Sequence, residues 1–200
     1  MKPVIISTGM AKLHEIDETI EAFKSTGNPN LIILHCNSSY PSNNEELNLK
    51  LIDNYKKIYP CPIGYSDHTE DLLSSIISLS KGANVIERHF TLDKNMEGPD
   101  HILSSTPEEM KLLVNYSYEI PKINGDGFKK IQPNEYVTLN AQKKSIYAKR
   151  KIRKGEKFTE ENIVIKGPAG GLPSKYYYLI INKKSKLEIQ EDFPIKWECI

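Results

Sequence analysis

Apolar and amphipathic segments alternate along the first 118 residues of this 200-residue chain. Each apolar segment is short enough for a buried strand, and each amphipathic segment that follows has the length of a helix. The expected strands span 3–7, 31–36, 62–65 and 84–89, and the expected helices span 11–25, 44–58, 70–80 and 107–118. Because strands separated by helices pair in parallel through right-handed crossovers, this order predicts an α/β fold with a parallel sheet.

Two of the expected helices have a recognisable start signal. Thr69 precedes an acidic first turn, Glu70 and Asp71, and Thr106 precedes Pro107 at the first position of the last helix. A threonine in this place can accept hydrogen bonds from free backbone N–H groups, and proline is favoured at the first helical position. We therefore expect both threonines to cap helices.

The pattern changes after residue 120. Residues 121–142 contain two prolines and several Gly or Asn turn signals around 124–127, and they lack apolar periodicity. Beyond them, short β-rich pieces alternate with turns. These pieces are 144–149, 162–166, 187–190 and 194–198. We predict an α/β domain over 1–120, a linker over 121–142 and a small β-rich domain over 143–200.

The composition argues against membrane and secreted classes. Hydrophobic residues make up 38% of the chain and the formal net charge is +1. No apolar run approaches the roughly 18 residues that a membrane helix needs, and the first residues lack the apolar stretch of a secretory signal. Cys36, Cys61 and Cys199 are an odd number without CxxC spacing, which favours bystander thiols over a disulfide framework or a cysteine zinc site. A cytoplasmic protein with no membrane partner is expected.

One segment of the small domain is strongly basic. Between residues 143 and 154, seven of twelve side chains are Lys or Arg. Such a cluster can bind nucleic acid. However, Ile146, Tyr147 and Ile152 are interleaved with the basic residues, as in a half-buried strand, and this favours a solvated strand face. We expect no nucleic-acid partner.

Two histidines occupy matching positions after successive expected strands. His68 lies in Gly64-Tyr65-Ser66-Asp67-His68-Thr69, and His89 lies in Val85-Ile86-Glu87-Arg88-His89-Phe90-Thr91. Parallel strands bring their carboxyl ends to one rim, and neutral imidazoles there suit a divalent metal. A hydrogen-bonded structural role is the alternative for each ring.

For several other residues near these histidines, the sequence allows either a functional or a structural role. Asp67 and Glu87 could orient the imidazoles or could be strand-end charges. His14 and His35 are expected to be structural. Four hydroxyl or amide side chains lie at three strand exits and could hold a phosphate or could form caps and turns. They are Ser7, Asn37, Ser38 and Ser66. Asp100, in a tight turn after the fourth strand, could hold a polyol hydroxyl or a metal-bound water, or could stabilise that turn.

Taken in order, five motifs closely resemble the sialic acid synthase family, which includes the N-acetylneuraminate, legionaminate and pseudaminate synthases. They are Ile6-Ser7-Thr8-Gly9-Met10, Leu34-His35-Cys36-Asn37-Ser38-Ser39-Tyr40-Pro41, Gly64-Tyr65-Ser66-Asp67-His68-Thr69, Ile86-Glu87-Arg88-His89-Phe90-Thr91 and Gly98-Pro99-Asp100-His101. The segments 152–156 and 159–163 resemble that family's C-terminal antifreeze-like domain of the SAF type. The resemblance implies the last four βα units of a TIM barrel followed by a SAF domain.

The resemblance also implies a reaction and roles for particular residues. Family members condense phosphoenolpyruvate with an N-acyl hexosamine-type sugar, such as N-acetylmannosamine, to give a nine-carbon 2-keto acid. By resemblance, His68 and His89 are ligands of a divalent ion, usually Mn²⁺. Ser7, Asn37, Ser38 and Ser66 fall where the family contacts phosphoenolpyruvate. Tyr40 and Asp100 fall where it contacts the sugar or the reacting groups.

Two features depart from the family pattern. The family barrel has eight strands, and its N-terminal half, with a catalytic glutamate and phosphate-binding lysines, has no counterpart here. We therefore expect this chain to be inactive alone and to need a complementing N-terminal chain, unless it is a non-catalytic carbohydrate- or partner-binding remnant. Family members are homodimers, in which an arginine of a Lys-Arg-Pro segment reaches the partner's active site. Gly167 stands at that position.

Overall fold

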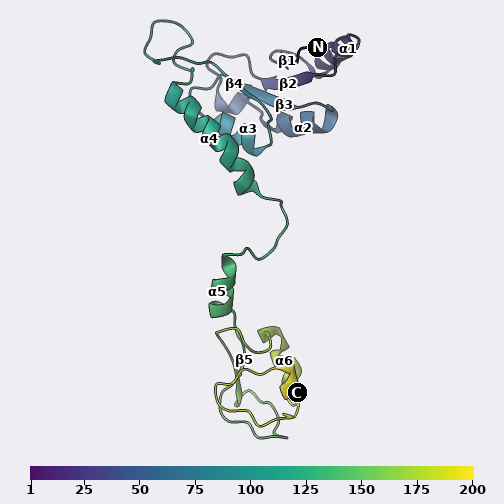
Figure 1. The fold of residues 1–200 in the computed structure, drawn as a ribbon, viewed down its shortest axis with the longest axis vertical. Coiled ribbons are helices and arrows are strands. Elements are labelled where there is room, and N and C mark those ends of the chain that lie inside the picture. The colour runs from purple at the N-terminus through teal and green to yellow at the C-terminus, as the bar shows by residue number, and fades with distance from the viewer. The chain divides into compact units, whose positions relative to one another are not determined.

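The computed structural model describes residues 1–200, which form two compact units, Met1–Gly127 and Phe128–Ile200 (Figure 1). Each unit has its own cluster of buried apolar side chains. No helix in the chain combines the length and the apolar character that crossing a bilayer requires.

A parallel sheet of four strands forms the centre of the first unit. The strands are β1 (Val4–Ser7), β2 (Leu31–Cys36), β3 (Ile63–Asp67) and β4 (Ile86–Arg88), and they lie side by side in chain order. The connecting helices are α1 (Leu13–Lys24), α2 (Lys50–Ile58), α3 (Leu73–Ser80) and α4 (Pro107–Asn124). The expected α/β class and the half-barrel order of four βα units are confirmed.

Hydrophobic packing between the sheet and the helices holds this unit together. Ile33, Ile63 and Tyr65 point from β2 and β3 toward the helices and are no more than 1% exposed. Ile16 and Ile52, on α1 and α2, belong to the same buried cluster. Side chains alternate along each strand, so the next residues, such as Leu34 and Ser66, face the opposite side of the sheet.

Gly64 allows β3 to pass close to its neighbours on that opposite side. A Cβ atom at this position would lie 2.4 Å from Cδ2 of Leu34 and 2.5 Å from the carbonyl oxygen of Val85. These distances are far below normal carbon contacts. Any larger residue at position 64 would therefore push β2 and β3 apart just before the strand ends that carry the candidate site.

Several expected helix boundaries were wrong. The expected helix over 44–58 is split into a 3-10 turn at Asn44–Glu46 and α2, because Asn48 takes a left-handed conformation with φ of 46°. Helix α3 begins at Leu73, three residues after the expected start at residue 70, and Asp71 accepts the backbone N–H of Leu73.

Helix α4 begins at Pro107 as expected, but it ends at Asn124, six residues beyond the expected end at 118. The side chain of Thr106 accepts the N–H of Glu109 at 3.3 Å, and the Glu109 carboxylate accepts the N–H of Thr106 at 2.9 Å. This reciprocal capping box satisfies two backbone donors at once.

The second unit contains an antiparallel pair, β5 (Ser145–Ala148) and β6 (Ile163–Lys166). Two of the expected β-rich pieces, 187–190 and 194–198, are not strands. They contribute only single bridges, Ile152 with Ile189 and Tyr147 with Pro194, and a 3-10 turn covers Trp197–Cys199. Short helical turns at Ser174–Tyr176 and α6 (Tyr177–Ile180) complete the unit.

The segment expected as a linker, 121–142, contains the end of α4 and a further helix, α5 (Glu135–Gln142).

The basic segment that follows, 143–154, contains both buried and exposed residues. All four residues of β5 are buried, whereas Arg150 and Lys151 are exposed and paired with Glu156 and Glu188 at 2.8 Å.

Candidate metal and substrate site

The carboxyl ends of β3 and β4 place two histidines next to each other. Asp67 and Arg88 are register partners at the ends of these parallel strands, and His68 and His89 follow them directly. The two imidazole rings lie 5.3 Å apart between centroids, with an interplanar angle of 84°. The structure thus brings together the two histidines that the sequence singled out.

Tyr40 and Asp100 lie against the same pair. The ring of Tyr40 is 4.2 Å from that of His68 and 5.8 Å from that of His89, measured between centroids. A carboxylate oxygen of Asp100 lies 3.5 Å from Nδ1 of His89. Tyr40 is 52% exposed while His68 is buried, so the phenol covers the inner ring from the solvent side.

The hydrogen bonds of the rings determine which nitrogen is available to a ligand. Nδ1 of His68 lies 2.8 Å from the carbonyl oxygen of Asn37. A carbonyl oxygen can only accept, so this partner assigns the proton to Nδ1 and leaves a lone pair on Nε2. Nδ1 of His89 lies 3.5 Å from the Asp100 carboxylate, a longer contact that points to the same assignment. This is the arrangement in which imidazoles bind metals through Nε2.

A complete metal cage is absent from the chain. No group of three or more His, Cys, Asp and Glu side chains is arranged to hold an ion. The donor set therefore amounts to two imidazole nitrogens. Two such donors fit a divalent transition ion whose remaining positions are taken by water or substrate oxygens.

Ser66 and Glu87, the register partners one step before Asp67 and Arg88, form a second polar pair. The Ser66 hydroxyl donates to a Glu87 carboxylate oxygen at 2.7 Å. By strand alternation this pair faces the same side of the sheet as the histidines. Glu87 thus bonds to Ser66. It makes no hydrogen bond to either imidazole, so nothing supports the expectation that it orients one. Asp67 faces the helices and contacts neither ring, so its alternative reading as an outer acceptor was wrong.

The remaining expected substrate residues lie at the ends of β1 and β2. Ser7 is exposed at the end of β1. The side-chain amide of Asn37 donates to the carbonyl of Glu46 at 3.1 Å. Ser38 lies close to Gly9, where a Cβ atom would be 2.0 Å from its hydroxyl oxygen. The absence of a side chain at Gly9 therefore lets the loop after β1 approach the loop after β2.

Sequence reasoning missed two participants. Cys36 was assigned as a bystander, but its sulfur lies 4.0 Å from Nδ1 of His68 and 3.8 Å from the hydroxyl of Ser38. Its register partnership with Ser66 would have placed it on this face. Arg88, which directly precedes His89, was also missed. Its side chain lies on the helix side of the sheet and bonds to Asp67, Thr69 and Ser105, and no local sequence pattern indicates these contacts.

His35 lies on the helix side of the sheet and takes no part in the site. Its Nε2 is 2.6 Å from the carbonyl oxygen of Leu47, and its ring stacks on Tyr65 at 5.8 Å between centroids. Burial lowers the pKa of His35 below the usual value of an imidazole, against the opposing effect of the Leu47 carbonyl.

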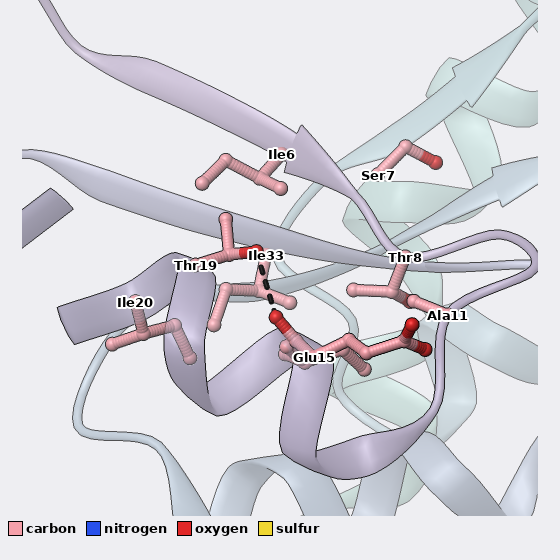
Figure 2. Close-up of a pocket in the computed structure, with 9 residues that line it drawn as sticks. Ile6, Ser7, Thr8, Ala11, Glu15, Thr19, Ile20 and Ile33 are labelled. Atoms are coloured by element: carbon pink, nitrogen blue, oxygen red, sulfur yellow. Dashed lines mark hydrogen bonds between the residues drawn. The ribbon is translucent and has the colours of Figure 1, made fainter. Parts of the chain in front are cut away.

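A small cavity lies on the helix side, beneath β1. It has a volume of about 80 Å³ and is enclosed mainly by apolar side chains of β1, β2 and α1. Figure 2 shows Ile6 and Ile33 from the sheet facing Ile20 from α1, with the hydroxyl of Thr19 bonded to the carbonyl of Glu15 at 2.7 Å. No imidazole of the candidate site lines this cavity.

Fold and site define an α/β protein with part of a TIM-type barrel, polar chemistry at the carboxyl ends of its strands, and a second small β-containing unit. Residues 1–129 match the model of the NeuB family, and residues 143–200 match that of the SAF domain. The chain belongs to the NeuB family, and the resemblance to sialic acid synthases is confirmed.

Similar proteins carry related names. The chain is 42% identical over 197 residues to the N,N'-diacetyllegionaminic acid synthase of Campylobacter jejuni, a match that covers 98% of this chain and 59% of that protein. It is 34% identical to the human N-acetylneuraminate-9-phosphate synthase, with 100% and 56% covered. The crystal structure of the N-acetylneuraminic acid synthetase of Leptospira borgpetersenii matches with a TM-score of 0.62 and 38% identity over 68% of this chain and 48% of that one. The chain thus spans a little over half the length of the curated relatives it matches.

Proposed function

We propose that this chain supplies the metal-binding part of a sialic acid synthase-like enzyme, which condenses phosphoenolpyruvate with an N-acyl hexosamine-type sugar to a nine-carbon 2-keto acid. The observation that supports the proposal is the proximity of the His68 and His89 rings, with Nδ1 of His68 hydrogen-bonded to the Asn37 carbonyl and Nδ1 of His89 3.5 Å from the Asp100 carboxylate. The names of the relatives support the substrate class.

The two Nε2 atoms would hold a divalent ion, Mn²⁺ by the family resemblance. When bound, such an ion polarises the aldehyde of the open-chain sugar as a Lewis acid. Asp100, next to His89, is within reach of a sugar hydroxyl or a bound water. Tyr40 forms an aromatic wall over the imidazoles that excludes water from one side of the sugar.

The polar groups at the other strand exits would bind phosphoenolpyruvate. Ser7, Asn37, Ser38 and Ser66 present hydroxyl and amide groups at the ends of three adjacent strands. Asn37 keeps one amide N–H beyond its bond to Glu46, and the Ser66 hydroxyl would have to turn away from Glu87 to donate to the anion. Neutral donors of this kind position an anion, while most of the charge neutralisation has to come from cations. No lysine or arginine side chain hydrogen-bonds to these four residues, so the proposal assigns the cationic contacts to another segment.

By the family resemblance, we assign that segment to the N-terminal half of the barrel, since the chain matches a little over half the length of its curated relatives. Strand β1 is an edge strand, and its residues Val4 and Ile5 are 36% and 51% exposed. An exposed apolar edge is a site for strand addition. We propose a complementing (βα) chain or segment as the partner, and a cytoplasmic location, which the three free cysteines support.

Metal binding tests the proposal directly. The 200-residue chain is titrated with Mn²⁺ at pH 7.5, where imidazoles are mostly neutral, and binding is followed by electron paramagnetic resonance of the free ion. We expect saturable binding of one ion, and a loss of affinity of at least about tenfold in His89→Ala. His14→Ala, at an exposed helix position, is the matched control and should bind as the unmodified chain does.

Activity tests the need for a complementing part. The chain is incubated with phosphoenolpyruvate, N-acetylmannosamine and Mn²⁺, alone and with the N-terminal part of the Campylobacter jejuni relative. Keto-acid formation is expected only in the mixture. Product from the chain alone would refute the need for a partner. Absence of Mn²⁺ binding in every sample would instead favour a non-catalytic carbohydrate- or partner-binding remnant.

A further inference from the structure

Behind the two histidines, on the helix side of the sheet, lies a buried ion pair. The carboxylate of Asp67 accepts a hydrogen bond from the guanidinium of Arg88, and the side chains of the two residues are 0% and 1% exposed. The Asp67 carboxylate also accepts from the backbone N–H and hydroxyl of Thr69, at 2.9 and 2.8 Å, and from the hydroxyls of Ser74 and Ser75 at the start of α3. Every oxygen of this carboxylate is therefore engaged.

Arg88 distributes its donors over three separate segments. Nε donates to the hydroxyl of Ser105 at 2.7 Å, and Nη2 donates to the carbonyls of Thr69 at 2.8 Å and Leu103 at 3.3 Å. With Asp67 on Nη1, the guanidinium connects the end of β4 to the end of β3 and to the segment before α4. Lysine, with a single nitrogen, could not reach these partners together.

The network also surrounds the backbone of the candidate ligands. The N–H of Ser105, whose side chain binds Arg88, donates to the carbonyl of His89 at 2.8 Å. His68 and His89 directly follow Asp67 and Arg88, which are register partners. A rotation or slip of either strand end would therefore move one imidazole relative to the other.

Stability alone does not explain this arrangement. Removing two charges from water costs about as much as their attraction returns, and apolar residues of similar size often serve the core as well. A fixed network of directional hydrogen bonds, by contrast, restricts the strand ends to one geometry.

We propose that Asp67 and Arg88 are positioning residues, which set the separation and orientation of the His68 and His89 imidazoles from the opposite face of the sheet. The inference rests on the proposed function in so far as the imidazoles hold a divalent ion. The orientation of the rings can nevertheless be measured without any metal.

Arg88→Lys tests the proposal, because it keeps the positive charge and removes the forked donors. Arg150→Lys is the matched control: Arg150 also pairs with a carboxylate, at 2.8 Å from Glu156, but it is exposed and lies in the other unit. Circular dichroism and thermal unfolding establish that both variants are folded. Nitrogen-15 correlation spectra at pH 8 then report the tautomer of each of the five histidines, with His68→Ala used for assignment.

In the unmodified chain and in Arg150→Lys, His68 should carry its proton on Nδ1. In a folded Arg88→Lys, the spectrum should shift to a mixture of both tautomers, and the affinity for Mn²⁺ should fall by about tenfold. If a folded Arg88→Lys keeps the Nδ1 tautomer, the proposal is wrong. If the tautomer changes while even the unmodified chain binds no Mn²⁺, the positioning role stands and the proposed metal function fails.

If Arg88→Lys does not fold, Ser105→Ala tests the positioning role instead. It removes one neutral partner of the guanidinium and leaves the ion pair intact. Partial loss of the Nδ1 tautomer of His68, or a broadened His89 signal, supports the positioning role. Spectra identical to those of the unmodified chain contradict it.

Discussion

At the scale of single residues, the histidines of the first unit differ in which ring nitrogen finds a partner. In His68 the Asn37 carbonyl engages Nδ1, which leaves Nε2 for a ligand. In His35 the Leu47 carbonyl engages Nε2, and the ring is buried against Tyr65. The position of the hydrogen-bond partner thus distinguishes His68, a candidate metal ligand, from His35, a histidine of the core.

The lowered pKa of His35 makes the stability of the first unit depend on pH. Because the folded chain resists protonation of this buried ring, the unfolded chain binds more protons below its pKa of about 6.5. Stability from this source is complete above about pH 6.5 and is lost as the pH falls toward the lower folded pKa. In urea titrations between pH 5 and 7, the free energy of unfolding should fall as the pH drops below about 6.5.

His35→Gln retains a donor for Leu47 and should abolish that fall. His14→Gln, at an exposed position on α1, should keep it. An equal fall in the two variants would show that His35 is not the group responsible.

At the scale of elements, two threonines with similar sequence surroundings behave differently. Thr106 caps α4 through a reciprocal bond with Glu109, whereas the hydroxyl of Thr69 bonds to Asp67 in the buried network. The order of strands and helices was readable because it rests on long apolar periodicities. The position of Thr69 depends on Arg88, 19 residues away, and no local pattern reports such a contact.

The candidate site was likewise predictable only where local sequence patterns determine it. The pairing of His68 and His89 was predictable, because both follow strands that the helical connections make parallel. The direction of Asp67 and the closeness of Cys36 were not, because they depend on the register between neighbouring strands, which no local pattern gives. In the second unit, 187–190 and 194–198 pair through single bridges, too short to leave a strand pattern distinct from a turn.

The capping box of α4 should make a measurable contribution to stability. Thr106→Ala removes the acceptor of the Glu109 N–H and should lower the free energy of unfolding of the first unit by about 1 kcal/mol in urea titrations. The control is Thr19→Ala, in the middle of α1, where the hydroxyl only bonds to the carbonyl of Glu15. Alanine favours helix there, so this variant should be neutral or slightly stabilising. A neutral Thr106→Ala would rule out a stabilising cap.

At the scale of the whole molecule, the net charge of +1 conceals opposite charges in the two units. Residues 1–127 contain 11 basic and 18 acidic side chains, a balance of −7, whereas residues 128–200 contain 16 and 8, a balance of +8. The second unit therefore has a strong positive field of its own. A composition averaged over the chain could not reveal it.

Each unit also has a separate hydrophobic core, and this division has a thermodynamic consequence. Phe158 is fully buried in the second unit among Ile146, Ile163 and Ile180. Phe158→Ala should therefore cost about 3–5 kcal/mol through the cavity it leaves. Because the buried cluster of the first unit consists of other residues, residues 16–65, the loss should fall on the second unit alone.

The single tryptophan allows the two units to be followed separately. Trp197 lies in the second unit against Tyr176, at 5.1 Å between ring centroids, while far-ultraviolet circular dichroism is dominated by the four helices of the first unit. In Phe158→Ala, the fluorescence transition of Trp197 should move to lower urea while the dichroism transition stays in place. Phe193→Ala, at a side chain that is 45% exposed, should shift neither by much. Both signals moving together in Phe158→Ala would mean that the two cores unfold as one cooperative unit.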